Sequence, residues 1–216
     1  MNVSPAMNSK ANSNASAPDD RAIMTANPDE VAFGSTSIRL HDLVNRGSEF
    51  DLLYLYEPLL AACHLAIGQP FRLSSMLART VKPNSKAQAL HTDVKRVNGL
   101  TSAVGFIFMV DDFRADNGAT RFVPGSHWWG ESRCEDVPDR IADHPGQELA
   151  LGSAGSVIIY DGTVWHGHTS NGTNDPRRSI QGMFIQRDGP IRSSQTIHML
   201  PETLSRIGAL AKYLVC

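Results

Sequence analysis

Apolar residues between positions 50 and 67, in the segment FDLLYLYEPLLAACHLAI, recur at three- and four-residue intervals. This spacing is typical of a helix with one apolar face, and Gly68 follows where such a helix would end. The pattern therefore predicts a helix over residues 57–67. Near the C-terminus, the amphipathic segment PETLSRIGALAKYLV predicts a further helix that begins at Pro201.

From residue 71 onward the pattern changes to short runs that are rich in Val, Ile, Phe and Thr. Turn signals rich in Gly, Pro and Asn separate these runs: KPNS from residue 82, DNGA from 116, PGSH from 124, HPGQ from 144, GSAG from 152 and SNGTNDP from 170. Many short strands with such turns are typical of a sandwich, a jelly roll or a barrel. We therefore expect an all-β core with flanking helices.

The length of the chain, 216 residues, suits one substantial core, so we expect a single domain over residues 31–216. Residues 1–30 are a low-complexity mixture that is rich in Asn, Ser, Ala and Pro. Such a segment has too little apolar surface to order itself by burial. We expect a disordered tail there.

The composition narrows the classes of partner. A net charge of −2 provides no overall positive field to attract nucleic acid or an anionic membrane. No apolar run approaches the roughly 18 residues that a membrane span needs, and the N-terminus lacks the features of a signal peptide. The odd number of cysteines, 3, argues against a disulfide framework. We expect a cytoplasmic monomer or homodimer that acts on a small molecule and binds neither nucleic acid nor membrane.

The segment LHTDV places His91 and Asp93 two positions apart. On a strand, side chains at i and i+2 point to the same face, so these two groups would converge while Thr92 points away. A third metal ligand would come from VWHGH, in which His166 and His168 are again two apart. Two imidazoles and one carboxylate on a face with open positions are the ligand geometry of non-haem Fe(II) oxygenases.

Arg177 follows His166 across a loop rich in Asn and Gly, at the start of the strand-like run RRSIQGMFI. A guanidinium group can hold a carboxylate through two parallel hydrogen bonds. A metal triad with such an arginine one strand away indicates a substrate that chelates metal at one end and carries a carboxylate at the other. 2-Oxoglutarate fits this description.

Three sequence blocks, LHTDV, GFIFMVDDFRADNGATRFVPGSHWWG and VWHGHTSNGTNDPRRSIQGMF, resemble in that order the phytanoyl-CoA dioxygenase family of Fe(II)/2-oxoglutarate-dependent oxygenases. The resemblance covers about residues 71–190. It implies a double-stranded β-helix, which is a cupin-like jelly roll. It also implies Fe(II) as the metal, 2-oxoglutarate as the cosubstrate and O2 as the oxidant.

Carried onto this sequence, the resemblance implies that the iron ligands are His91, Asp93 and His166. The carboxylate at position 93 favours oxygen insertion, because halogenases similar to the family lack it and use the vacant position for halide.

The resemblance also implies that Arg177 binds the distal carboxylate of 2-oxoglutarate. Its neighbour Arg178 is the alternative, although it would point to the opposite face of the strand. Ser179 lies on the same face as Arg177 and could donate a second hydrogen bond to that carboxylate. Thr92 and Thr80 are further candidate contacts to the cosubstrate.

The reaction expected by default is hydroxylation of a C–H bond with release of succinate and CO2. Desaturation, epimerisation or ring formation in specialised metabolism would use the same iron site. A Zn-dependent hydrolase or isomerase on a cupin-like roll would use the same three ligands, but its chemistry does not require Arg177. A third class, a binding protein without catalysis, is disfavoured by the intact triad.

Overall fold

The computed structural model describes residues 31–95, 103–129, 136–189 and 199–216, so the tail predicted over residues 1–30 lies outside the described residues. The strands are β1 (Val31–Phe33), β2 (Ser37–Leu40), β3 (Phe71–Val81), β4 (Ala103–Met109), β5 (Thr120–Val123), β6 (Glu148–Ala150), β7 (Val157–Asp161), β8 (Trp165–His168) and β9 (Arg177–Gln186). The α-helices are α1 (Asp51–Tyr54), α2 (Glu57–Ile67), α3 (Pro201–Arg206) and α4 (Ala209–Val215), and the 3₁₀ helices are η2 (Leu43–Asn45), η3 (Ser48–Phe50) and η4 (Ser126–Trp128).

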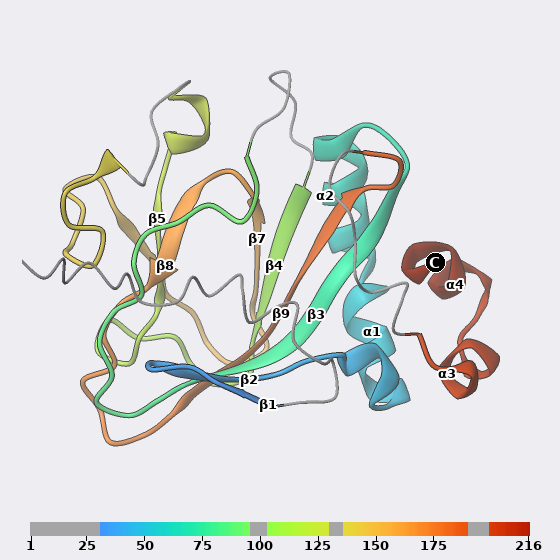
Figure 1. The fold of residues 1–216 in the computed structure, drawn as a ribbon, viewed down its shortest axis with the longest axis horizontal. Coiled ribbons are helices and arrows are strands. Elements are labelled where there is room, and N and C mark those ends of the chain that lie inside the picture. Colours follow the sequence, from blue (N-terminus) through green and yellow to red (C-terminus); the bar gives the residue numbers. More distant parts are fainter. Residues whose placement is uncertain (1–30, 96–102, 130–135, 190–198) are drawn as a thin grey trace, which may run out of the picture.

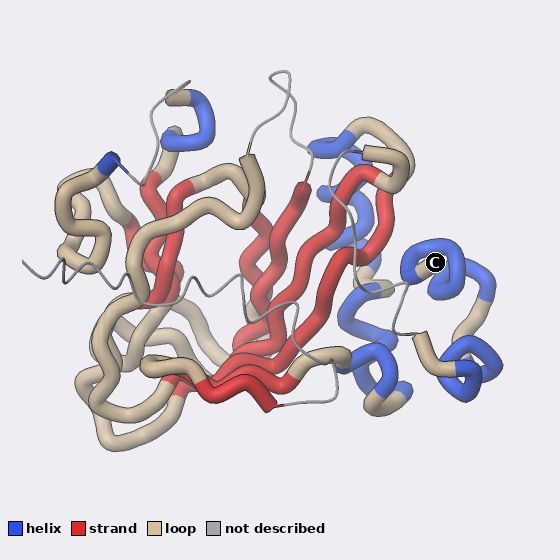
Figure 2. Tube along the Cα trace, in the orientation of Figure 1, coloured by secondary structure: helices blue, strands red, loops and turns tan. Residues whose placement is uncertain are grey.

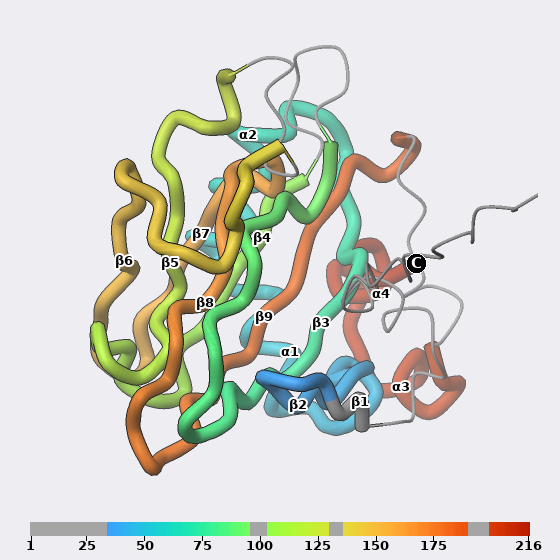
Figure 3. Tube along the Cα trace, turned by 60° about the vertical axis from the view of Figure 1, so that its left-hand side comes forward, coloured from blue at the N-terminus to red at the C-terminus, as the bar shows by residue number. Residues whose placement is uncertain are grey.

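Two antiparallel sheets organise the described part of the chain (Figure 1). The large sheet has the strand order β1-β2-β3-β9-β4-β7, and the small sheet has the order β6-β5-β8. From β4 to β9 the chain crosses repeatedly between the two sheets, which Figure 3 shows from a second side. This arrangement is a jelly roll, as the sequence predicted.

Residues 88–91 run beside β8 and extend the small sheet. The N–H group of Gln88 donates to the carbonyl group of His168 at 2.9 Å. His91 and His166 exchange two backbone hydrogen bonds, of 3.0 and 2.9 Å, in an isolated antiparallel bridge. Between these contacts, a Cβ atom at Gly167 would approach the carbonyl oxygen of Gln88 to 3.1 Å. Glycine therefore allows the two backbones to come close where the site is built.

The large sheet has two different faces because side chains alternate along each strand. Phe106 and Phe184 belong to the main hydrophobic cluster, which they share with the helices. Ile107 and Met109, on the other face of β4, belong to a separate cluster with Phe113. Figure 1 and Figure 2 show helices α1–α4 gathered on one side of the large sheet, whereas the short helix η4 follows β5 of the small sheet. The face without helices is directed toward the small sheet and carries the candidate site.

Most predicted elements are confirmed. The predicted helix over residues 57–67 is α2, which ends at Gly68 with a φ of 63°. The change of pattern at residue 71 coincides with the start of β3, and the six predicted turn segments lie outside the long strands. Among the described residues, no single helix is long and apolar enough to cross a membrane, although the bent pair Ser48–Tyr54 and Glu57–Ile67 meets that test by length and composition.

The C-terminal segment differs from the prediction, because it forms the two helices α3 and α4 rather than one. Ile207 ends α3 in an extended conformation, with φ −80° and ψ 147°. Its side chain is 5% exposed and packs in the main hydrophobic cluster. Burial of this side chain outweighs continuation of the helix, and Gly208, a poor helix former, follows at the break.

Candidate metal centre

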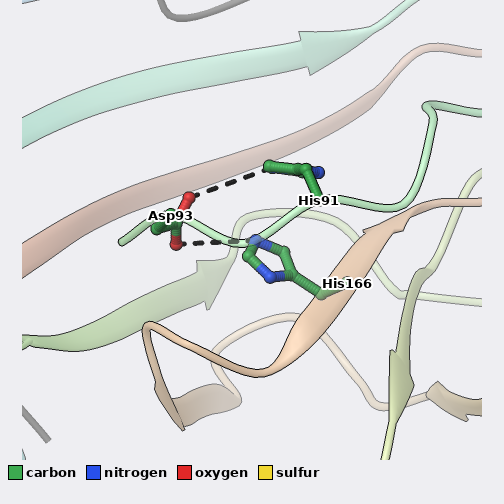
Figure 4. A group of neighbouring side chains, drawn as sticks. All are labelled: His91, Asp93 and His166. Carbon is green, nitrogen blue, oxygen red and sulfur yellow. Dashed lines mark ion pairs between the residues drawn. The ribbon is translucent and has the colours of Figure 1, made fainter. Parts of the chain in front are cut away.

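His91, Asp93 and His166 converge in the structure, and their potential ligand atoms all lie within 4.8 Å of one another (Figure 4). The Nε2 atom of His166 is 3.5 Å from Oδ2 of Asp93, and the Nε2 atom of His91 is 3.9 Å from Oδ1. Both imidazoles therefore face the same carboxylate through the same ring atom.

The backbone around this group corrects one expectation, because His91 and Asp93 do not lie on a strand. His91 forms only the isolated bridge to His166, and Asp93 lies in a bend. Residues paired in an antiparallel bridge direct their side chains to the same face, so the bridge brings the two rings together at a centroid distance of 4.4 Å. The N–H group of Asp93 donates to the Gly162 carbonyl at 2.9 Å, which anchors the bend.

A hydrogen bond from Nδ1 to a backbone carbonyl orients each of the two histidines, His91 and His166. The Nδ1 atom of His91 lies 3.1 Å from the carbonyl oxygen of Ala89, and that of His166 lies 3.0 Å from the carbonyl oxygen of Val164. A carbonyl oxygen only accepts, so Nδ1 carries the hydrogen in both rings. The lone pair of each ring is therefore on Nε2, the atom that faces Asp93. This is the usual arrangement of metal-binding histidines.

Burial keeps the imidazole of His91 neutral. Desolvation, followed by the nearby His166 ring, lowers the pKa of His91 to about 4. A neutral imidazole can donate its lone pair to a metal, whereas a protonated one cannot. The donor set, two imidazoles and one carboxylate, fits Fe(II) and also fits Zn²⁺.

Tyr160 is a site residue that the sequence analysis missed. Its hydroxyl group donates to Oδ2 of Asp93 at 2.9 Å. Proximity to this carboxylate and, above all, burial raise the pKa of Tyr160 well above its usual value, so the phenol is protonated and is the donor. No local pattern in VIIYDG identifies this role, because the contact joins residues 67 positions apart.

Arg177 is a buried cation on the inner face of β9, where it is only 2% exposed. Its Nη2 atom donates to the Gly118 carbonyl at 2.6 Å, and its Nη1 atom donates to the hydroxyl oxygen of Ser179 at 3.2 Å. The guanidinium carbon lies 4.1 Å from the centre of the Phe113 ring. Burial lowers the pKa of Arg177 to about 10, so the side chain is still charged at neutral pH.

Arg178 has a different environment, as the strand alternation predicted. Its guanidinium group and its backbone N–H donate three hydrogen bonds to the carboxylate of Asp111, at 2.7, 2.9 and 2.7 Å. Its side chain is 59% exposed. Of the two adjacent arginines, only Arg177 points into the interior.

The strand register places the remaining candidates. Ser179 pairs with Arg79 across β3 and β9, so Arg79 shares the inner face with Arg177, a neighbour that the sequence analysis did not identify. Thr80 instead pairs with Arg178 and lies on the opposite face. The register therefore separates Thr80 from Arg177, and a contact of Thr80 with the cosubstrate stays a prediction. Thr92 is half-buried between His91 and Asp93, with which it forms the HTD motif, and its role stays a prediction.

His168, the other histidine of VWHGH, does not join the cluster of ligand atoms. Its Nδ1 atom lies 2.8 Å from the carbonyl oxygen of Thr169, and its Nε2 atom lies 3.2 Å from the Thr36 hydroxyl. Both ring nitrogens are therefore engaged in hydrogen bonds. His166 remains the histidine of this pair that faces Asp93.

Comparison with known proteins finds the family that the three sequence blocks resemble. Residues 3–179 match the phytanoyl-CoA dioxygenase (PhyH) family. Dioxygenase af480 of Aspergillus fumigatus is 33% identical over 141 residues, covering 63% of this chain and 41% of the relative. The Fe(II)/2-oxoglutarate-dependent dioxygenase nvfF of Aspergillus novofumigatus is 28% identical over 188 residues, covering 82% of this chain and 60% of the relative. The chain spans less than two thirds of the length of these relatives.

Solved structures share the fold. HygX from Streptomyces hygroscopicus, with nickel, 2-oxoglutarate and hygromycin B bound, is 16% identical with a TM-score of 0.59, over 74% of each chain. SnoN, the non-heme alpha ketoglutarate dependent epimerase from nogalamycin biosynthesis, is 19% identical with a TM-score of 0.58, over 81% of each chain. Because the family match extends over most of the sequence and includes the HTD motif and His166, the distal histidine, this chain belongs to the phytanoyl-CoA dioxygenase (PhyH) family.

Proposed function

We propose that this protein is an Fe(II)- and 2-oxoglutarate-dependent oxygenase that oxidises a C–H bond of a small molecule. The observation that carries the proposal is the convergence of His91, Asp93 and His166, with ligand atoms within 4.8 Å of one another. The family match and the relative nvfF, whose name includes this cofactor pair, support it.

In the proposed site, His91 and His166 bind the metal through Nε2, and Asp93 binds it through its carboxylate. Their Nδ1 hydrogen bonds to backbone carbonyls hold both rings in the ligating orientation. Bound Fe(II), with 2-oxoglutarate and O2, would supply an oxidant that removes hydrogen from a substrate C–H bond, and the cosubstrate would leave as succinate and CO2. The protein positions the reactants and shields them from water.

Arg177 suits the distal carboxylate of 2-oxoglutarate. In the described part of the chain its Nε atom has no hydrogen-bond partner, and none of its hydrogen bonds is to a carboxylate. A buried guanidinium group without an acidic partner is costly, and an incoming carboxylate would neutralise it. Ser179, which accepts from Arg177, has a hydroxyl hydrogen to donate to the same carboxylate.

Hydroxylation is the reaction that we propose first. Desaturation, epimerisation or ring formation would use the same residues, and one structural relative, SnoN, is named an epimerase. A Zn-dependent hydrolase would use the same three ligands, but its reaction would not require a buried positive charge at Arg177.

The test is release of succinate from 2-oxoglutarate by the purified chain with Fe(II) under air, in the presence of candidate small molecules. Asp93→Ala should abolish release, because it removes a metal ligand. Arg177→Ala should raise the KM for 2-oxoglutarate by about 10- to 100-fold, as expected for loss of hydrogen bonds to a charged group. Arg178→Ala, at the exposed neighbouring position, is the matched control and should leave the KM unchanged.

Full succinate release by Asp93→Ala would refute the ligand assignment. Equal effects of Arg177→Ala and Arg178→Ala would remove the case for the carboxylate site. Hydrolysis or isomerisation that depends on Zn²⁺ and survives Arg177→Ala would favour the second class.

A further inference from the structure

The Asp93 carboxylate has few restraints of its own. The residue lies in a bend rather than in a sheet, and its side chain is 21% exposed. Among the described residues, the Tyr160 hydroxyl group donates a hydrogen bond to it at 2.9 Å, and the Nε2 atoms of the two imidazoles that would bind the metal face it without donating. The orientation of the carboxylate therefore depends on the orientation of Tyr160.

Gly105 determines the position of the Tyr160 ring. The two residues pair directly across β4 and β7, so their side-chain positions lie on the same face of the large sheet. A Cβ atom at position 105 would lie 2.2 Å from Cζ of Tyr160 and 2.6 Å from its hydroxyl oxygen. The ring thus occupies the space that a side chain at position 105 would need.

The same ring also contacts the second histidine. The centre of the Tyr160 ring lies 4.9 Å from that of His166 and 5.2 Å from that of Phe122. Phe122 in turn stacks on His166 at 5.7 Å, with an angle of 27° between the ring planes. Two aromatic rings therefore hold the His166 imidazole, and one of them also holds the Asp93 carboxylate.

We propose that Tyr160 is a positioning residue for the metal centre, and that Gly105 makes room for it. This inference rests on the proposed function. The hydroxyl group occupies one acceptor site on Oδ2 of Asp93 and holds the carboxylate between the two Nε2 atoms. A carboxylate can bind a metal through one oxygen or two. With a metal bound, the hydrogen bond from Tyr160 to Oδ2 would favour ligation by Asp93 through one oxygen and would leave room for the cosubstrate or O2.

The experiment measures metal binding without turnover. Co²⁺ is titrated into the metal-free chain by calorimetry, and the visible absorption bands of bound Co²⁺ report its coordination. Tyr160→Phe removes the hydroxyl group and keeps the ring. It should weaken Co²⁺ binding by about 10- to 100-fold, which is typical for loss of a hydrogen bond to a metal ligand, and it should alter the absorption bands.

A second variant, Gly105→Ala, tests the same inference independently. It displaces the Tyr160 ring while the Tyr160 hydroxyl group remains. It should change the Co²⁺ affinity and the absorption bands in the same direction. The matched control is Tyr54→Phe, which removes a hydroxyl group that donates to the carboxylate of Asp51, also at 2.9 Å, in helix α1. That variant should bind Co²⁺ as the unmodified chain does.

The outcomes separate the two proposals. If the unmodified chain binds neither Co²⁺ nor Fe(II), the proposed function fails. If the unmodified chain binds Co²⁺ and Tyr160→Phe shows the same affinity and the same absorption bands, only the positioning role is wrong. An equal loss of affinity in Tyr54→Phe would also overturn it, because the effect would then be one of general stability.

Discussion

At the scale of single residues, two adjacent arginines have opposite roles because a strand directs successive side chains to opposite faces. Arg178 is exposed and bound to Asp111, whereas Arg177 is buried beside Ser179. The Asp111 carboxylate also accepts from the backbone N–H of Arg178. This contact secures the start of β9 and hence the inward orientation of Arg177.

A first prediction concerns Asp111 and pH. The hydrogen bonds from Arg178 lower the pKa of Asp111 below its usual value of 3.8. A lowered carboxyl pKa contributes stability that is present above the usual value and is lost as the pH falls through the folded-state value. Asp111→Asn should therefore lower the urea midpoint of unfolding at pH 7, and the difference from the unmodified chain should shrink near pH 3.

Asp116→Asn is the control for this measurement, because Asp116 belongs to an ion pair in which both side chains are more than half exposed. Exposed pairs of this kind contribute little to stability. A difference for Asp111→Asn that stayed constant from pH 7 to pH 3 would contradict the assigned cause.

A second prediction separates charge from geometry at Arg177. Lys at this position keeps a positive charge but loses the planar fork that matches a carboxylate. Arg177→Lys should therefore raise the KM for 2-oxoglutarate by about 10-fold or more, as loss of a charged hydrogen bond implies. Arg178→Lys is the control, and an unchanged KM in Arg177→Lys would show that charge alone suffices.

At the scale of elements, the segment before His91 is held by Arg121, a fully buried residue of β5. The side chain of Arg121 donates to four backbone carbonyls, those of Gln88, Arg140, Ile141 and Ala142, at distances from 2.7 to 3.1 Å. It thereby fastens residues 140–142 to the segment that pairs with β8. The position of His91 depends on these Arg121 hydrogen bonds, because Gln88 lies three residues before it.

A third prediction tests the hydrogen bonds that Arg121 donates to the backbone. Arg121→Met retains much of the side-chain volume but removes the donor from four backbone carbonyl groups, those of Gln88, Arg140, Ile141 and Ala142. It should reduce the free energy of unfolding by about 3 kcal/mol, measured by urea denaturation. It should also weaken Co²⁺ binding. Arg114→Met removes a guanidinium group that is 53% exposed, and it should cost no more than about 0.5 kcal/mol. Equal losses of unfolding free energy in the two variants would show that the Arg121 hydrogen bonds have no special role.

At the scale of the whole molecule, helices α1–α4 lie on one face of the large sheet, and the opposite face carries the candidate site. The proposed metal ligands come from two segments, residues 91–93 and β8, that meet only in the folded chain. A metal that binds all three ligands therefore binds the folded state in preference to the unfolded state.

A fourth prediction follows for thermal unfolding. Ni²⁺ at about 100 times its Kd should stabilise the chain by about 2.7 kcal/mol and raise the melting temperature by several degrees. Asp93→Ala should lose this shift, whereas Asp116→Asn should retain it. A shift of the same size in both variants would indicate that Ni²⁺ binds elsewhere.

The sequence by itself determined the local features: α2 and its end at Gly68, the turns, and the opposite directions of Arg177 and Arg178. These depend on residue spacing and on backbone preferences within a few positions. The HTD motif and the distal histidine also identified the family, although the backbone around the motif is a bridge and a bend rather than the expected strand.

Only the tertiary structure decided which distant residues meet. The register of β3 and β9 moved Thr80 away from Arg177 and brought Arg79 to the inner face. The pairing of β4 with β7 placed the Tyr160 ring over Gly105. Burial of an isoleucine broke the predicted C-terminal helix. Each outcome depends on contacts between segments far apart in the chain, where a shift of one residue reverses the face of every side chain, and local pattern does not encode that choice.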